Sequence, residues 1–110
     1  MSEKELLDNK ILCLKQLRLS KWQLIWNREF ELSFDKEVEE DALKKLEASA
    51  TFNPNINPEA VKAKWQQLQL QMAGKEGEIV RAKKAIEKLD LIIKELETLY
   101  EKTFNNNSGN

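Results

Sequence analysis

Residues 79–100 read IVRAKKAIEKLDLIIKELETLY, a stretch in which apolar residues recur every three or four positions. This spacing places them on one side of an α-helix, because a helix turns once in about 3.6 residues. The pattern begins at residue 61 and forms two columns of residues seven apart. They are Trp65, Met72, Ile79, Ile86, Ile93 and Tyr100, and Val61, Leu68, Lys75, Ala82, Leu89 and Leu96. Because only Lys75 is not apolar, the stretch predicts a long helix that packs against another helix as in a coiled coil.

The segment TFNPNINP at residues 51–58 contains both prolines of the chain and predicts the turn before this helix. Asn57 followed by Pro58 and Glu59 predicts a helix start, with a capping side chain, a proline at the first helical position and an acid in the first turn. The second helix is therefore expected over about residues 58–104. A polar tail at residues 105–110 is expected to be disordered.

A first helix is expected over about residues 2–49, since no glycine or proline interrupts that range. Ser2 and Glu5 form a capping box at its start. A kink near residues 33–35 remains open, because Ser33 and Asp35 are residue types that cap internal helix ends. The predicted fold is all-α: one domain at residues 1–104, a long antiparallel, coiled-coil-like hairpin with its turn at residues 51–57.

The predicted helices carry more apolar surface than one seam covers. On the first helix, one side holds Leu7, Ile11, Leu14, Trp22 and Ile25, extended by Leu12, Leu19, Trp26 and Phe30, and a separate strip holds Leu6, Cys13, Leu17 and Leu24. From Ile79 onward, Ala85, Ile92 and Leu99 add a third column to the second helix. Surplus apolar strips mark interfaces, so we expect the hairpin to form a dimeric helical bundle or to join another helical protein.

Two sets of candidate site residues follow from these strips. The interface or core set is Trp22, Ile25, Trp26, Phe30, Trp65, Leu68, Met72, Ile79, Ile86, Leu89, Ile93, Leu96 and Tyr100. The candidate partner-binding surface is Leu6, Leu17, Leu24, Lys10, Arg18, Lys21 and Arg28. We interpret Trp22 and Trp26 mainly as core of the hairpin or of its dimer rather than as a ligand site.

Charge also predicts how the helices face each other. Residues 29–47 contain eight acids and three bases, whereas residues 61–75 contain three lysines and no acid. Folding at the turn places these two ranges opposite each other, and their charges attract.

The chain offers little catalytic chemistry. It has no histidine, the commonest general base and metal ligand, and Cys13, its only cysteine, lies among leucines and is expected to be a buried structural thiol. The acids at residues 37–41 are interpreted as a solvated face rather than a cation site. Gly74 and Gly77 are expected to allow close approach of Phe30 or Phe34, with a hinge as the alternative. No enzyme activity, metal, cofactor or small-molecule substrate is expected.

Composition leaves three hypotheses for function. A net charge of −1 gives no global field for nucleic acid, and the charged N-terminal stretch MSEKELLDNK predicts neither a signal peptide nor a membrane span, so a cytoplasmic location is expected. The leading hypothesis is a non-catalytic interaction module, a subunit or adaptor acting through coiled-coil contacts. One alternative is a nucleic-acid-binding dimer that uses residues 9–28, which hold five bases and no acid. The other is a small chaperone that shields an apolar client segment.

Overall fold

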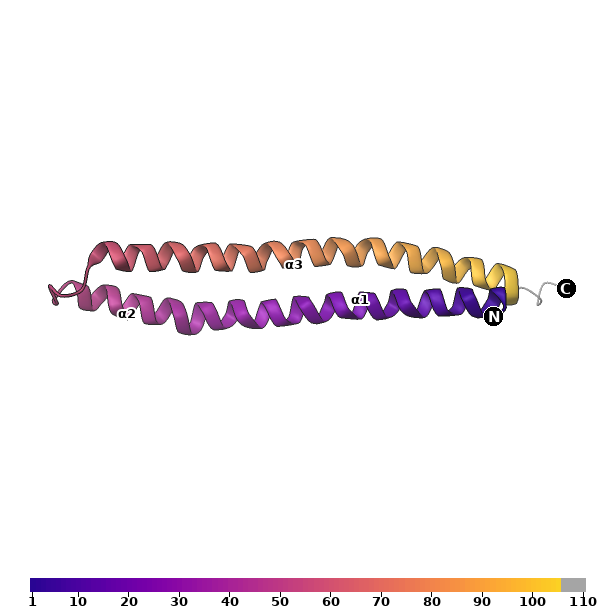
Figure 1. Ribbon diagram of the computed structural model, residues 1–110, viewed down its shortest axis with the longest axis horizontal. Helices are drawn as coiled ribbons and strands as arrows, with labels where there is room; N and C mark the ends of the chain where they lie inside the picture. Colours follow the sequence, from indigo (N-terminus) through magenta and orange to yellow (C-terminus); the bar gives the residue numbers. More distant parts are fainter. Residues whose placement is uncertain (106–110) are drawn as a thin grey trace. The chain divides into compact units, whose positions relative to one another are not determined.

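The computed structural model describes residues 1–105, and within that range the chain forms helices and no strand. The three α-helices are α1 (Glu3–Phe34), α2 (Glu40–Ala50) and α3 (Pro58–Tyr100). Two π-helical segments, Asp35–Glu39 and Glu101–Asn105, follow α1 and α3 directly. Figure 1 shows how the chain leaves α2 through residues 51–57 and returns as α3. The predicted all-α helical hairpin is confirmed, and apart from Asn105 the predicted tail lies outside the described residues.

Side chains satisfy the backbone at the first turns of α1 and α3, where N–H groups have no partner within the helix. Ser2 Oγ accepts a hydrogen bond from the Glu5 N–H at 3.2 Å and donates one to Glu5 Oε1 at 3.3 Å. Asn57 Oδ1 accepts from the Glu59 N–H at 3.0 Å, directly before Pro58. Both predicted N-caps are therefore present.

No side chain caps the backbone between α1 and α2. Phe34 directly precedes the π-helical segment, and Glu39 is its last residue. Both residues have right-handed helical dihedral angles, and neither makes a side-chain cap hydrogen bond. Ser33 donates instead to Glu37 Oε1 at 3.3 Å, and Asp35 accepts from Lys75. The chain thus passes from α1 to α2 through a widened helical turn rather than through a capped break.

The chain divides into two compact units, each an antiparallel pair of helical segments. Unit 1 combines Met1–Leu24 with Arg81–Asn110, and unit 2 is Ile25–Val80. In unit 1, Ile11 packs with Leu89 and Ile93, and Leu7, Leu14, Leu96 and Tyr100 surround this cluster. The Tyr100 ring also lies 5.4 Å from the Phe104 ring and 5.8 Å from Lys4 Nζ. The start of α1 and the end of α3 are thereby joined by apolar, aromatic and cation–π contacts.

Unit 2 buries apolar side chains of α1 and α3, whereas α2 has no buried residue. The buried apolar residues are Ile25, Leu32, Val61, Leu68, Met72 and Ile79. Ile25 is the most buried of them, with 1 % of its surface exposed. Asp35 is buried in the same unit, so its charge requires a partner.

The N-cap of α3 gives a first testable prediction. Replacing Asn57 by Ala removes the acceptor of the Glu59 N–H and should lower the free energy of unfolding by about 0.5–2 kcal/mol, the usual cost of a lost N-cap. Asn55→Ala is the matched control, because Asn55 lies in the same turn and uses its backbone N–H, not its side chain, to bind Asn53. Urea unfolding followed by circular dichroism measures both variants. Equal losses in the two variants would show that the Asn57 side chain does not stabilise the helix start.

Candidate interaction surfaces

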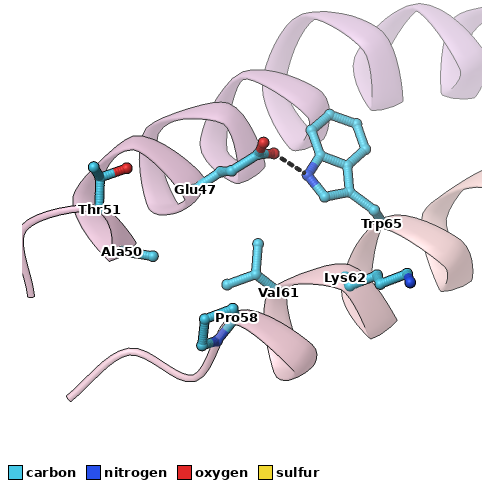
Figure 2. Close-up of a pocket in the computed structure, with 7 residues that line it drawn as sticks. All are labelled: Glu47, Ala50, Thr51, Pro58, Val61, Lys62 and Trp65. Atoms are coloured by element: carbon cyan, nitrogen blue, oxygen red, sulfur yellow. Dashed lines mark hydrogen bonds between the residues drawn. The ribbon is translucent and has the colours of Figure 1, made fainter. Parts of the chain in front are cut away.

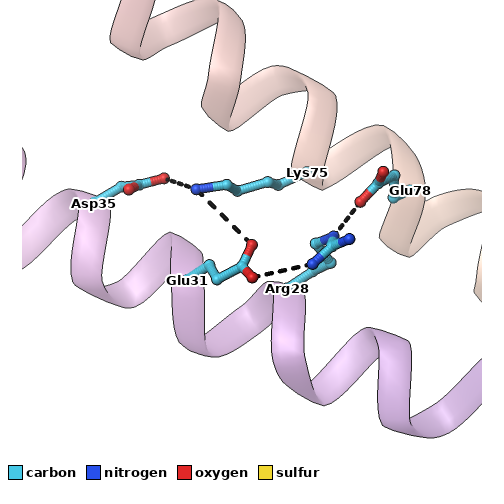
Figure 3. A network of polar contacts seen from close by, with 5 residues as sticks. All are labelled: Arg28, Glu31, Asp35, Lys75 and Glu78. Carbon is cyan, nitrogen blue, oxygen red and sulfur yellow. Dashed lines mark hydrogen bonds and ion pairs between the residues drawn. The ribbon is translucent and has the colours of Figure 1, made fainter.

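A network of ion pairs joins α1 and its π-helical extension to α3 inside unit 2 (Figure 3). Lys75 Nζ donates to Asp35 Oδ2 at 2.6 Å and lies 3.9 Å from Glu31 Oε2. Arg28 donates to Glu31 Oε1 at 3.0 Å and, through Nε, to Glu78 Oε2. Residues 29–47 therefore do face residues 61–75 here, as their opposite charges predict.

Lys75 is the one polar member of the two heptad columns, and its position explains why it is tolerated. Its side chain is 23 % exposed, and the Asp35 side chain that it neutralises is 8 % exposed. A buried carboxylate is costly unless paired, so only registers that bring Lys75 to Asp35 are favourable. A polar residue in a helical seam fixes register in this way in coiled coils.

The Arg28 pairs contribute less, because their side chains are closer to water. The hydrogen bond to Glu78 raises the pKa of Arg28 above its ordinary value, partial burial acts in the opposite direction, and the charge of Glu31 adds to the increase. A raised pKa means that the charge of the guanidinium contributes its stabilisation fully below the ordinary pKa of arginine and loses it only as the pH rises above that value. The guanidinium therefore adds no pH dependence to stability in the neutral range.

All twelve positions of the heptad columns are at least partly buried within their own unit. Val61, Leu68, Met72, Ile79, Ala82, Ile86, Leu89 and Ile93 are 9 % exposed or less, and Trp65, Lys75, Leu96 and Tyr100 are half-buried. On α1, Ile25 is buried, whereas the Trp22, Trp26 and Phe30 side chains are 37 %, 54 % and 74 % exposed. Of the expected interface or core residues, the three α1 aromatics are thus the ones at the surface of the chain.

The expected partner-binding surface is only partly accessible. Leu6, Leu17 and Lys10 are exposed, and Leu24 and Lys21 are half-buried. Arg18 donates to Asp90 at 2.8 Å in unit 1, and Arg28 belongs to the network of unit 2. Lys15, a further base of residues 9–28, pairs with Glu97 at 3.1 Å. Three of the five bases in this stretch are therefore already neutralised by acids of α3.

A hollow of about 400 Å³ lies at the turn end of unit 2, between the end of α2 and the start of α3 (Figure 2). Its lining residues are Glu47, Ala50, Thr51, Pro58, Val61, Lys62 and Trp65. Trp65 Nε1 donates to Glu47 Oε2 at 2.9 Å across the hollow, which holds the indole in place. A mainly apolar lining with one acid and one base suits the binding of an apolar side chain better than catalysis.

Two expectations about single residues are wrong. Cys13 is exposed rather than buried, because it lies on a strip of α1 that no other described segment covers. A Cβ added to Gly74 would meet nothing within 4 Å, so Gly74 does not make room for a close neighbour. Neither position was accessible to reasoning from local sequence, since both depend on which side of a helix faces its partner.

Among residues 1–105, no group of three or more carboxylate or thiol side chains converges as metal ligands would. No helix in that part of the chain is long and apolar enough to cross a membrane. Comparisons with protein-family models, with curated proteins and with solved structures found no match for this chain.

Proposed function

We propose that this chain is a non-catalytic helical interaction module, a subunit or adaptor that binds other helices through coiled-coil contacts. One observation carries the proposal. The heptad columns of α3 are at least partly buried inside the two units, whereas other apolar side chains at helical spacing remain exposed. On α1 these are Leu6, Leu12, Leu17, Leu19, Trp22, Trp26 and Phe30, with 37–74 % of each exposed. Apolar strips that are exposed to water cost free energy, and a partner that covers them removes that cost.

The partner in this proposal is a second copy of the chain or another helical protein, in a cytoplasmic setting. A nucleic-acid-binding dimer has less support, because Lys15, Arg18 and Arg28 already pair with acids of α3. Phosphate contacts would have to compete with these pairs. The exposed Trp26 and Phe30 rings also suit a chaperone that shields an apolar client, which keeps that function as a second candidate.

The mass of the protein in solution tests the proposal. We expect the chain, 12.9 kDa as a monomer, to sediment at twice that mass or more at micromolar concentration, or to do so with a partner captured from its native cell extract. A monomer that stays well behaved across the concentration range and captures nothing would overturn the proposed function.

A further inference from the structure

The two edges of the helix pair in unit 1 differ in chemistry. One edge carries the ion pairs Lys15–Glu97 and Arg18–Asp90. At about 100° per residue, Leu6, Cys13, Leu17 and Leu24 lie on the far side of the buried stripe of α1 from Lys15. By the same count, Ala85, Ile92 and Leu99 lie on the far side of the buried stripe of α3 from Asp90 and Glu97. Because the helices are antiparallel, these two strips share one edge of unit 1.

This shared edge, here named the Leu17 face, is mainly apolar on both helices, and its Leu24, Ala85 and Ile92 side chains are half-buried. Leu6, Leu17 and Leu99 are 55 %, 45 % and 51 % exposed. The outer positions of α1 beside it are Asn9, Gln16 and Gln23, which are polar but uncharged, and Lys10 is the one charged side chain on the α1 strip between Leu6 and Leu24. Depletion of charge at the centre is the compositional mark of a protein interface. The composition of the Leu17 face therefore favours its burial against a partner.

The spacing on α1 indicates what covers it. Positions 6, 10, 13, 17, 20 and 24 alternate steps of four and three, which is the seam of an antiparallel coiled coil. Leu6 and Leu24 are each nine residues from Lys15, and Cys13 and Leu17 are each two residues from it. The positions of the seam are therefore symmetric about Lys15. A two-fold axis level with Lys15 would place Leu6 on Leu24 of another copy, Cys13 on Leu17, and Lys10 on Ser20, whose hydroxyl can accept from the ammonium.

The strip on α3 is also symmetric, about Ile92. Ala85 and Leu99 are each seven residues from Ile92, so the axis would pair a small side chain with a large one. Lys15 and Arg18 bind Glu97 and Asp90, on either side of Ile92, so the centres of the two strips lie within about one helical turn of each other along unit 1. Lys88 and Glu95 stand four and three residues from Ile92 on the outer rim. Antiparallel self-association would bring each base to the other copy's acid, whereas parallel association would bring like charges together.

We infer that two copies of this chain associate through the Leu17 face into an antiparallel four-helix bundle, with α1 on α1 and α3 on α3. This inference rests on the proposed function and names its partner. The interface is isologous, since each copy contributes the same residues, and it closes without leaving a free copy of the face. The opposite strip of α1, with Leu12 and Leu19, has only charged residues such as Asp90 and Glu97 beside it on α3 and is not part of the interface.

Leu17→Glu and Leu19→Glu form a matched pair of variants for the test, because Leu17 is 45 % exposed, Leu19 is 49 % exposed, and they lie on opposite sides of α1. In sedimentation velocity, the native chain should be a dimer. Leu17→Glu should weaken the dimer by about 100-fold or more, since two unpaired carboxylates enter the seam. Leu19→Glu should leave it intact, and circular dichroism should find both variants helical.

A cross-linking measurement keeps the inference testable if Leu17→Glu does not fold. Leu17→Cys, with the native Cys13 present, should form disulfide-linked dimers under mild oxidation, and Leu19→Cys should not. Dimers that survive Leu17→Glu, or that Leu19→Glu abolishes, would overturn the Leu17 face but leave the proposed function standing. A native chain that is monomeric yet captures another protein would also overturn self-association alone. A monomer that captures nothing would overturn both.

Discussion

Replacing Ile93 by Ala should lower the free energy of unfolding by about 2–5 kcal/mol, the range found for deleting large aliphatic side chains from a core. Ile93 is 2 % exposed and packs with Ile11 and Leu89, inside a ring formed by Leu7, Leu14, Leu96 and Tyr100. The loss combines the transfer of the missing atoms to water with a cavity that the long, regular helices cannot easily close. A fall in Tm of at least about 10 °C should accompany it.

Leu91→Ala is the control, because Leu91 lies two residues away on the same helix and is 64 % exposed. It should change the free energy of unfolding by less than about 0.5 kcal/mol. Thermal and urea unfolding at one fixed chain concentration measure both variants, since any self-association makes stability depend on concentration. If Leu91→Ala cost as much as Ile93→Ala, α3 would present a different side to α1 from the one described for unit 1.

The sequence of α3 was enough to predict which of its sides is buried. Two columns with a sustained seven-residue period leave a single side for the seam, and Val61, Leu68, Ile86 and Ile93 are all buried there. Periodicity is a local property of the chain, so it can be read without knowing the partner helix.

The sequence of α1 did not permit the same choice, because three apolar strips wind around this helix. Ile11 is buried. Leu12 and Leu19, which the sequence pattern placed on the same side of the helix as Ile11, are 54 % and 49 % exposed. Contacts between residues far apart in sequence make the selection: Ile11 meets Leu89 and Ile93 while Lys15 meets Glu97. A pair of helices has only one seam, so every other strip remains at its surface. Cys13 and Gly74 were misjudged for the same reason.

The local sequence also does not predict the π-helical turn at Asp35–Glu39. This turn differs from an α-helical turn only in the carbonyl group to which each N–H donates its hydrogen bond. Its first residue is Asp35, whose carboxylate meets Lys75 of α3. The opposite charges of the two ranges predicted that they would face each other. They did not predict that a single lysine of the apolar columns would bind a single buried acid.

This ion pair leads to the second large prediction. Lys75→Met keeps the length and apolar stem of the side chain but leaves the Asp35 carboxylate, 8 % exposed, without its cation. Removing one partner of a buried pair is strongly destabilising, so we expect the free energy of unfolding to fall by about 2–4 kcal/mol. Lys45→Met is the control, because Lys45 pairs with Asp41 within α2 at 79 % side-chain exposure, and its loss should cost less than about 0.5 kcal/mol.

The double variant Asp35→Leu with Lys75→Met separates the cost of an orphaned charge from the value of the pair. With both charges gone, apolar packing replaces the ion pair, and most of the stability lost in Lys75→Met should return. The double-mutant cycle should therefore give an interaction energy of about 2 kcal/mol or more between the two positions, measured by urea unfolding. The double variant should also tolerate other registers of α1 on α3, because position 75 is then apolar like the other positions of the seam. Strictly additive losses would mean that Asp35 and Lys75 do not depend on each other, and that the apolar columns alone set the register in unit 2.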